Sequence, residues 1–189
     1  MLTRRHFIST AGAVAAFSAL PRTAQAAYTI PPEHMPQIVS IGKQYAPGEI
    51  HVDPNRFYLY WTQEKRKAIR YVVGVGKRGL YESGEFFVGE KKEWPSWRPT
   101  DDMIKRSPEQ YERYADGVPG GPGNPLGARA LYLHTADGVD SALRIHGTPQ
   151  PWTLGQAVSN GCARLANSHI IHLYERVPLG SRVVLYPQA

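Results

Sequence analysis

The chain has 189 residues, of which 42% are hydrophobic and 20% charged, with a formal net charge of +6. This length and balance suit one globular domain and exclude a collagen-like, coiled-coil or disordered chain. The 18 glycines, 16 prolines, 11 tyrosines and 4 tryptophans favour many short strands joined by turns over a helix bundle.

Residues 1–26 have the features of an export signal. Two arginines precede an apolar stretch from Phe7 to Leu20, and Ala24-Gln25-Ala26 has the form of a signal-peptidase site. The paired arginines favour the twin-arginine route over an ordinary secretory signal. The apolar stretch is shorter than the roughly 20 residues that a transmembrane helix needs. We therefore expect a soluble periplasmic chain with no membrane span after cleavage.

Charge and cysteine content restrict the partners of that chain. The removed segment holds three arginines and no acidic residue, so the net charge falls from +6 to +3. Such mild basicity gives no argument for nucleic acid and is compatible with an anionic envelope polymer. The single cysteine excludes an internal disulfide and a cysteine-based zinc site. It is either a buried apolar side chain or a thiol kept for chemistry.

The elements predicted after the signal are mainly strands. Residues 27–48 are proline-rich and should form an extended lead-in. Strands are predicted over residues 50–52, 56–61, 69–75, 84–88, 131–134, 143–146 and 182–186. Short helices are predicted near residues 101–106 and over 167–176, the second capped by Asn167. The long irregular stretch over 94–126 has the length of a functional loop.

Two further patterns have a functional and a structural interpretation. Gly74-Val75-Gly76-Lys77-Arg78-Gly79 matches the spacing of a dinucleotide-binding turn, but the residues that follow do not open a helix. We favour a glycine-rich strand end and keep a nucleotide site as the minor alternative. His169, His172 and Glu175 share one face of the predicted helix and could bind a metal. A polar helix face is the favoured interpretation, so we expect neither metal nor cofactor.

The strongest candidate for chemistry lies at the lone thiol. His146 ends a predicted strand, and Cys162 follows sixteen residues later, after a segment rich in turn residues. A cysteine nucleophile needs an imidazole that draws off its proton and backbone N–H groups that face the oxyanion. Gly161 would let the backbone approach a substrate closely, and Arg164 could pair with a carboxylate. These residues indicate an acyl-transfer cysteine enzyme.

The same residues resemble the signature of the bacterial L,D-transpeptidase (YkuD-like) catalytic domain. They read His-Gly-Thr from His146 and Ser-x-Gly-Cys-x-Arg from Ser159. The segment 123–127 is similar to the one that precedes the family's active-site strands, and residues 94–97 are similar to the wall of its substrate cleft. The resemblance covers roughly residues 48–187. It implies a mainly β domain over 49–187, with mixed, β-sandwich-like sheets and short helices.

The resemblance also implies roles for individual residues. Cys162 would be the nucleophile, His146 its base, and the Gly147 carbonyl the group that orients the imidazole. Backbone N–H groups of Gly161 and Cys162 would stabilise the oxyanion. The remaining implied roles are turn shaping and substrate contact, at Ser159, Asn160, Arg164, Thr148 and Trp97. Two positions depart from the family's pattern: Asn160 replaces a common histidine, and Tyr81-Glu82-Ser83-Gly84 replaces Thr-Pro-x-Gly.

The implied substrate is the stem peptide of peptidoglycan. Cys162 would attack the carbonyl that precedes a terminal D-alanine, release D-alanine and form a thioester, which an amine then resolves. Depending on the acceptor, the product would be a cross-link, an anchored protein, an exchanged D-amino acid or, with water, a hydrolysed peptide. A non-catalytic peptidoglycan-binding module is the alternative from a different class. The sequence does not address the oligomeric state.

Overall fold

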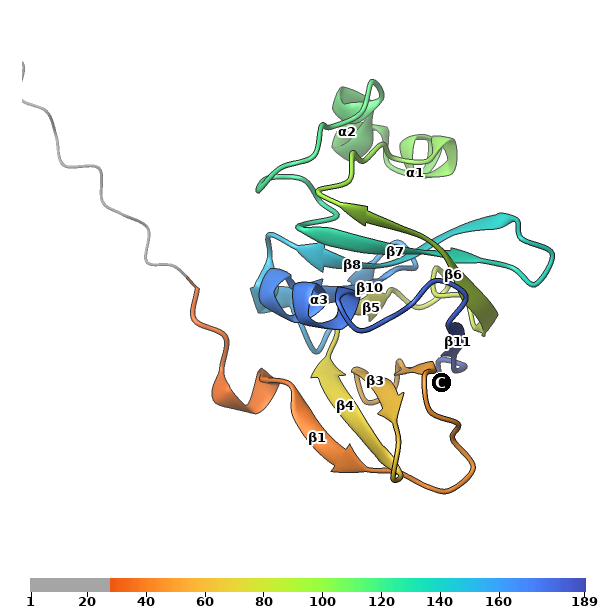
Figure 1. Cartoon of the computed structure of the whole chain (residues 1–189). Coiled ribbons are helices and arrows are strands. Elements are labelled where there is room, and N and C mark those ends of the chain that lie inside the picture. The colour runs from red at the N-terminus through yellow and green to blue at the C-terminus, as the bar shows by residue number, and fades with distance from the viewer. Residues whose placement is uncertain (1–27) are drawn as a thin grey trace, which may run out of the picture.

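The computed structural model describes residues 28–189, so the predicted signal and its cleavage site lie outside the described residues. Strands dominate and the helices are short, which confirms the predicted mainly β fold (Figure 1). No helix in the described range is both long and apolar enough to cross a membrane.

Eleven strands and six short helical segments follow in chain order in the described range. The strands are β1 (Gln37–Ser40), β2 (Ile50–Asp53), β3 (Tyr58–Gln63), β4 (Lys67–Val72), β5 (Val75–Gly76), β6 (Gly84–Glu93), β7 (Arg129–His134), β8 (Asp140–Thr148), β9 (Ala157–Ser159), β10 (Ala163–Ala166) and β11 (Arg182–Leu185). The α-helices are α1 (Asp101–Arg106), α2 (Pro108–Tyr111) and α3 (Asn167–Tyr174), and the 3-10 helices are η1 (Pro32–His34), η2 (Glu112–Tyr114) and η3 (Pro151–Thr153).

Nine of these strands form one mixed sheet in the order β1-β4-β3-β2-β11-β6-β7-β8-β10. The last strand of the chain, β11, lies in the middle, parallel to β2 and antiparallel to β6. It therefore joins the N-terminal meander of β1–β4 to the β6–β8 meander. The two remaining strands, β5 and β9, pair in parallel as a small second sheet. The main sheet is thus mixed, as the family resemblance implied.

Several boundaries differ from the sequence-based prediction. The lead-in predicted over residues 27–48 contains β1, which pairs with β4 at one edge of the main sheet. The strand predicted over 56–61 begins only at Tyr58, because Phe57 adopts a positive φ of 59° that a strand does not allow. Strands β9 and β10, and β5 beyond Val75, lie outside the predicted strands, because no run of β-branched or aromatic residues marks them.

Helix α3 covers the sheet next to the candidate catalytic strands, where it contacts β7, β8 and β10 (Figure 1). Ile170 and Leu173 are fully buried there. The prediction that Asn167 caps this helix is wrong, because Ala166 occupies the N-cap and no side chain accepts there. The Asn167 Oδ1 atom instead accepts a hydrogen bond from the Ala128 N–H at 2.9 Å. It thereby ties α3 to the segment that enters β7.

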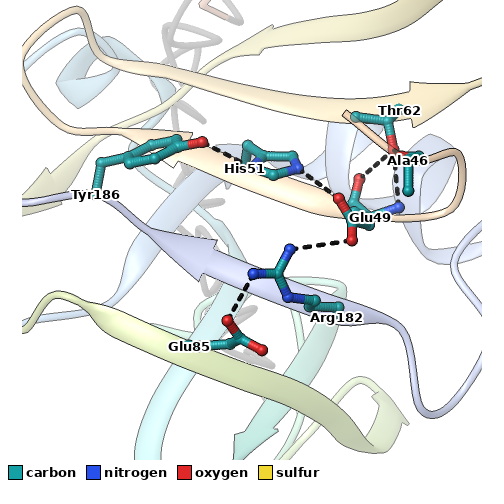
Figure 2. A network of polar contacts seen from close by, with 7 residues as sticks. All are labelled: Ala46, Glu49, His51, Thr62, Glu85, Arg182 and Tyr186. Atoms are coloured by element: carbon teal, nitrogen blue, oxygen red, sulfur yellow. Dashed lines mark hydrogen bonds and ion pairs between the residues drawn. The ribbon is translucent and has the colours of Figure 1, made fainter. Parts of the chain in front are cut away.

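A polar network stabilises the middle of the main sheet (Figure 2). Arg182 on β11 donates to the Glu49 carboxylate at 3.0 Å and to the Glu85 carboxylate at 2.6 Å. The His51 ring lies between Glu49, 3.0 Å from Nε2, and the Tyr186 hydroxyl, 3.1 Å from Nδ1. These contacts connect the two halves of the sheet across β11.

Candidate active site

The pairing of β8 with β10 brings the predicted catalytic residues together. The two strands run in parallel, with His146 opposite Arg164 and Ile145 opposite Ala163. Cys162 directly precedes β10. Arg164 therefore lies on the same face of the sheet as His146, and Cys162 stands two residues before Arg164 in the chain. The sheet register thus brings the turn that carries the thiol next to the strand that carries His146.

His146 is buried and held by its own neighbour. Its Nδ1 atom lies 2.6 Å from the Gly147 carbonyl oxygen, which can only accept, so Nδ1 carries the proton and donates. The basic lone pair is therefore on Nε2. Glycine is required at position 147, because a Cβ atom there would lie 2.4 Å from Asn167 Oδ1. The Asn167 contact that holds α3 and the Gly147 carbonyl that orients the His146 ring therefore both depend on the close approach of Asn167 to Gly147.

The environment keeps both partners neutral before substrate binds. Burial lowers the pKa of His146 to about 4, although the carbonyls of Gly147 and Leu126 favour the charged ring. Burial also raises the pKa of the Cys162 thiol, against the Arg144 N–H and the charges of Arg144 and Arg164. A thiol and a neutral imidazole therefore prevail near neutral pH. The proton must leave the thiol as it attacks, with the imidazole as general base.

The turn before Cys162 is fixed by Ser159. Its hydroxyl donates to the Cys162 carbonyl oxygen at 2.6 Å and accepts from the Gly161 N–H at 3.3 Å. Gly161 has a φ of 125°, and a Cβ atom there would lie 2.9 Å from the Leu80 carbonyl oxygen, so glycine is needed. The Gly161 N–H, expected to face the oxyanion, is directed at Ser159 instead. Of the two N–H groups expected to stabilise the oxyanion, that leaves the one of Cys162 as the candidate.

Two residues expected to contact substrate contact each other. Arg164 donates from one terminal nitrogen to the Thr148 hydroxyl at 2.8 Å and to the Gln150 side-chain oxygen at 3.2 Å. Thr148 is buried, so its visible role is to orient Arg164. The other guanidinium nitrogens can still pair with a carboxylate, because arginine has five N–H donors.

The segment over 94–126 folds into a small helical unit. Figure 1 shows α1 and α2 together beyond the ends of β6 and β7. The Trp97 ring packs against Tyr111 and Tyr114, with centroids 6.4 and 5.9 Å away. Asn160, in the turn before Cys162, accepts from Arg106 at 2.7 Å and donates to the Tyr111 hydroxyl at 2.8 Å. The sequence analysis missed Arg106 and Tyr111, because no local pattern joins them to a residue fifty positions away.

The two alternative sites are not supported. After Gly79 the chain turns into β6, and the next helix in the described range is α1, so the nucleotide-site alternative is wrong. His169 is buried, and both its ring nitrogens are without a hydrogen-bond partner in the described part of the chain. It is thus part of the core rather than of a polar helix face. His172 contacts the Tyr71 hydroxyl at 2.7 Å, and residues 28–189 hold no group of three potential metal ligands.

Comparison with known proteins identifies the family. The family model for the YkuD L,D-transpeptidase catalytic domain matches residues 47–185. The chain therefore belongs to this family. It is 31% identical to the probable L,D-transpeptidase ErfK/SrfK of Escherichia coli over 141 residues, a match that covers 74% of this chain and 43% of that protein. It is 35% identical to the probable L,D-transpeptidase YbiS of the same species over 126 residues, a match that covers 66% of this chain and 39% of that protein.

Solved structures are similar as well. A crystal structure from Brucella melitensis, described as a probable carnitine operon oxidoreductase, is 47% identical with a TM-score of 0.56, over 83% of this chain and 96% of that one. The catalytic domain of the Enterococcus faecium L,D-transpeptidase acylated by ertapenem shares the fold at 19% identity and a TM-score of 0.53, over 75% of this chain and 99% of that one. The chain spans about two fifths of the two Escherichia coli relatives.

Proposed function

We propose that the chain is a periplasmic L,D-transpeptidase that acts on peptidoglycan stem peptides through a Cys162 thioester. The observation that supports this best is the β8–β10 register, which sets His146 beside Arg164, while Cys162 is the residue directly before β10. The Gly147 carbonyl at 2.6 Å from Nδ1 leaves Nε2 as the base. The signal predicted over residues 1–26 supports the periplasmic location.

The first half of the reaction is acylation. The Cys162 sulfur attacks the carbonyl carbon that precedes a terminal D-alanine, while His146 Nε2 takes the thiol proton. Negative charge develops on the carbonyl oxygen, towards which the Cys162 N–H donates. When the C–N bond breaks, His146 returns the proton to the departing amine. A thioester and free D-alanine result.

The second half is transfer. An acceptor amine attacks the thioester carbonyl, gives a proton to His146 and forms an amide, and the leaving thiolate recovers that proton. An amine of a neighbouring stem peptide yields a cross-link, and a protein amine yields an anchored protein. Water in place of the amine yields a carboxypeptidase or cross-link hydrolase with the same acyl-enzyme.

The test is covalent labelling followed by product analysis. Incubation of the purified chain with ertapenem, which acylates the Enterococcus faecium domain, should give one adduct per chain by mass spectrometry. Cys162→Ala should give none while its circular dichroism is unchanged, because the small, partly buried thiol contributes little packing. Incubation with isolated cell-wall peptides should then release D-alanine. Turnover retained in Cys162→Ala would remove this thiol from the mechanism, and a chain without adduct or turnover would favour a binding module.

A further inference from the structure

The turn that carries Cys162 is held from a second direction. Asn160 accepts a hydrogen bond from the Arg106 guanidinium at 2.7 Å and donates one to the Tyr111 hydroxyl at 2.8 Å. Arg106 ends α1 and Tyr111 ends α2, so both partners come from the helical unit over 94–126. We refer to Arg106, Tyr111 and Asn160 as the clamp. It uses the acceptor and the donor of one amide side chain at the same time.

The helical unit is rigid enough to act as a support. Trp97 and Val118 exchange backbone hydrogen bonds at 2.9 and 2.6 Å, which close the base of the segment. The Trp97 ring packs on Tyr111, and Arg98 donates to the Ala115 carbonyl oxygen at 2.8 Å. Asn160 therefore binds to a segment that has its own backbone pairing and ring packing, rather than to an unsupported loop.

The turn needs such support because of its glycine. Gly161, with φ at 125°, separates Asn160 from Cys162, and a glycine backbone has more conformational freedom than any other residue. Within the turn, Ser159 holds the carbonyl of Cys162, and its contact with the Gly161 N–H is long at 3.3 Å. The direction of the Cys162 N–H therefore depends on both ends of a flexible residue. The clamp fixes the end that Ser159 holds weakly.

The amide at position 160 suits this role because an asparagine side chain does not titrate. An amide keeps its oxygen as acceptor and its nitrogen as donor at any pH. The contacts to Arg106 and Tyr111 thus stay the same while His146 changes its protonation state during the reaction.

We propose that Arg106 and Tyr111 are positioning residues for acylation, which act through Asn160 to aim the Cys162 N–H at the oxyanion. This inference rests on the proposed function. It predicts that loss of the clamp slows acylation of the Cys162 thiol but not its alkylation. Acylation passes through an oxyanion and needs the aimed N–H, whereas alkylation by iodoacetamide displaces iodide and develops no oxyanion.

The experiment compares both reactions in the full chain. Arg106→Ala, Tyr111→Phe and Asn160→Ala should each lower the limiting rate constant of acylation by ertapenem about tenfold or more, since a lost oxyanion donor costs about a hundredfold. The half-saturating ertapenem concentration and the rate of alkylation should stay within about twofold of wild type. The double variant Arg106→Ala/Asn160→Ala should be no slower than Asn160→Ala alone, because the loss of Asn160 already removes the contact to Arg106.

Controls separate this inference from the proposed function. Arg113→Ala removes a guanidinium that lies 4.7 Å over the Tyr114 ring in the same segment but does not contact the turn. It should acylate at the wild-type rate. A wild-type chain that forms no adduct overturns both proposals. If the wild type reacts, three results overturn the clamp alone. The clamp variants could acylate as fast as wild type, they could lose acylation and alkylation together, or the effects of the single variants could add in the double variant.

Discussion

His51 and His146 are both buried imidazoles on the main sheet, but their ring nitrogens are used differently. His51 donates from Nε2 to Glu49 and accepts from the Tyr186 hydroxyl at Nδ1, so neither nitrogen is left over (Figure 2). His146 uses Nδ1 on a backbone carbonyl and keeps Nε2 as a base. Burial lowers the pKa of both rings. Burial alone thus does not distinguish the two rings. The Nε2 lone pair of His146, which makes no hydrogen bond within residues 28–189, is what fits the role of base proposed for it.

The largest expected effect tests the catalytic side of this comparison. His146→Ala should lower acylation by ertapenem about a thousandfold at pH 7, the range of a lost general base. Raising the pH should restore part of the rate, because hydroxide then deprotonates Cys162. The measurement is a stopped-flow pH profile, with His51→Ala as the matched control. A profile without an alkaline rise would give His146 a structural role only.

The next effect concerns the guanidinium beside His146. Arg164→Lys should lower turnover of a tetrapeptide about a hundredfold, since lysine cannot pair with a carboxylate through two parallel N–H bonds. Alkylation should change little, because a positive charge remains near Cys162. Turnover and iodoacetamide rates are to be measured on the same samples. An equal fall in both would mean that Arg164 holds the turn, through Thr148, rather than the substrate.

A smaller effect is expected on the structural side. Glu49→Gln should lower the free energy of unfolding by about 1–3 kcal/mol, because His51 and Arg182 lose a partly buried, charged hydrogen-bond acceptor. Acylation by ertapenem should remain at the wild-type rate. Urea unfolding gives the stability, and Glu64→Gln at the exposed hairpin tip is the matched control. If Glu49→Gln acylates slowly, the network is coupled to the site.

The smallest effect is the pH dependence of stability. The pKa of His146 is about 4 when folded and near 6.5 when unfolded, so the unfolded chain binds the extra proton between these values. The free energy of unfolding should therefore fall as the pH drops from 6.5 towards 4. Each such histidine contributes at most about 1.4 kcal/mol per pH unit. His146→Gln should make the slope shallower in urea titrations at pH 7, 6 and 5, and an unchanged slope contradicts the shift.

The sequence predicted those parts of the fold that depend on local patterns. The runs that became β2, β7, β8 and β11 alternate or are rich in β-branched and aromatic residues. The short helix predicted near 101–106 is α1, which Thr100 caps in the structure. Strand β10 carries no such pattern over its four residues. It is a strand because β8 and the Gly74 backbone offer hydrogen-bond partners on either side.

The candidate site divides in the same way. The pair of His146 and Cys162 could be found from residue types and spacing, because the chemistry requires both. The clamp could not, since Arg106, Tyr111 and Asn160 meet only through the fold of 94–126. At Asn167 the local pattern predicted a contact that the fold does not make. A helix-capping residue in a favourable position was used for a longer-range contact to Ala128 instead.

The pairing of Gly74 to Gly76 with β9 and β10 has a consequence for folding. Arg164 exchanges backbone hydrogen bonds with Gly74, and the Lys77 N–H donates to the Ser159 carbonyl oxygen, so residues 74–77 hold one side of the turn that carries Cys162. Contacts between such distant segments form late, because the intervening chain must first be ordered. A fragment that starts at β7 would contain every residue of the signature and still lack these contacts. Under the proposed function, a reactive Cys162 thiol therefore requires the completed domain, and partly folded chains would carry only an ordinary cysteine.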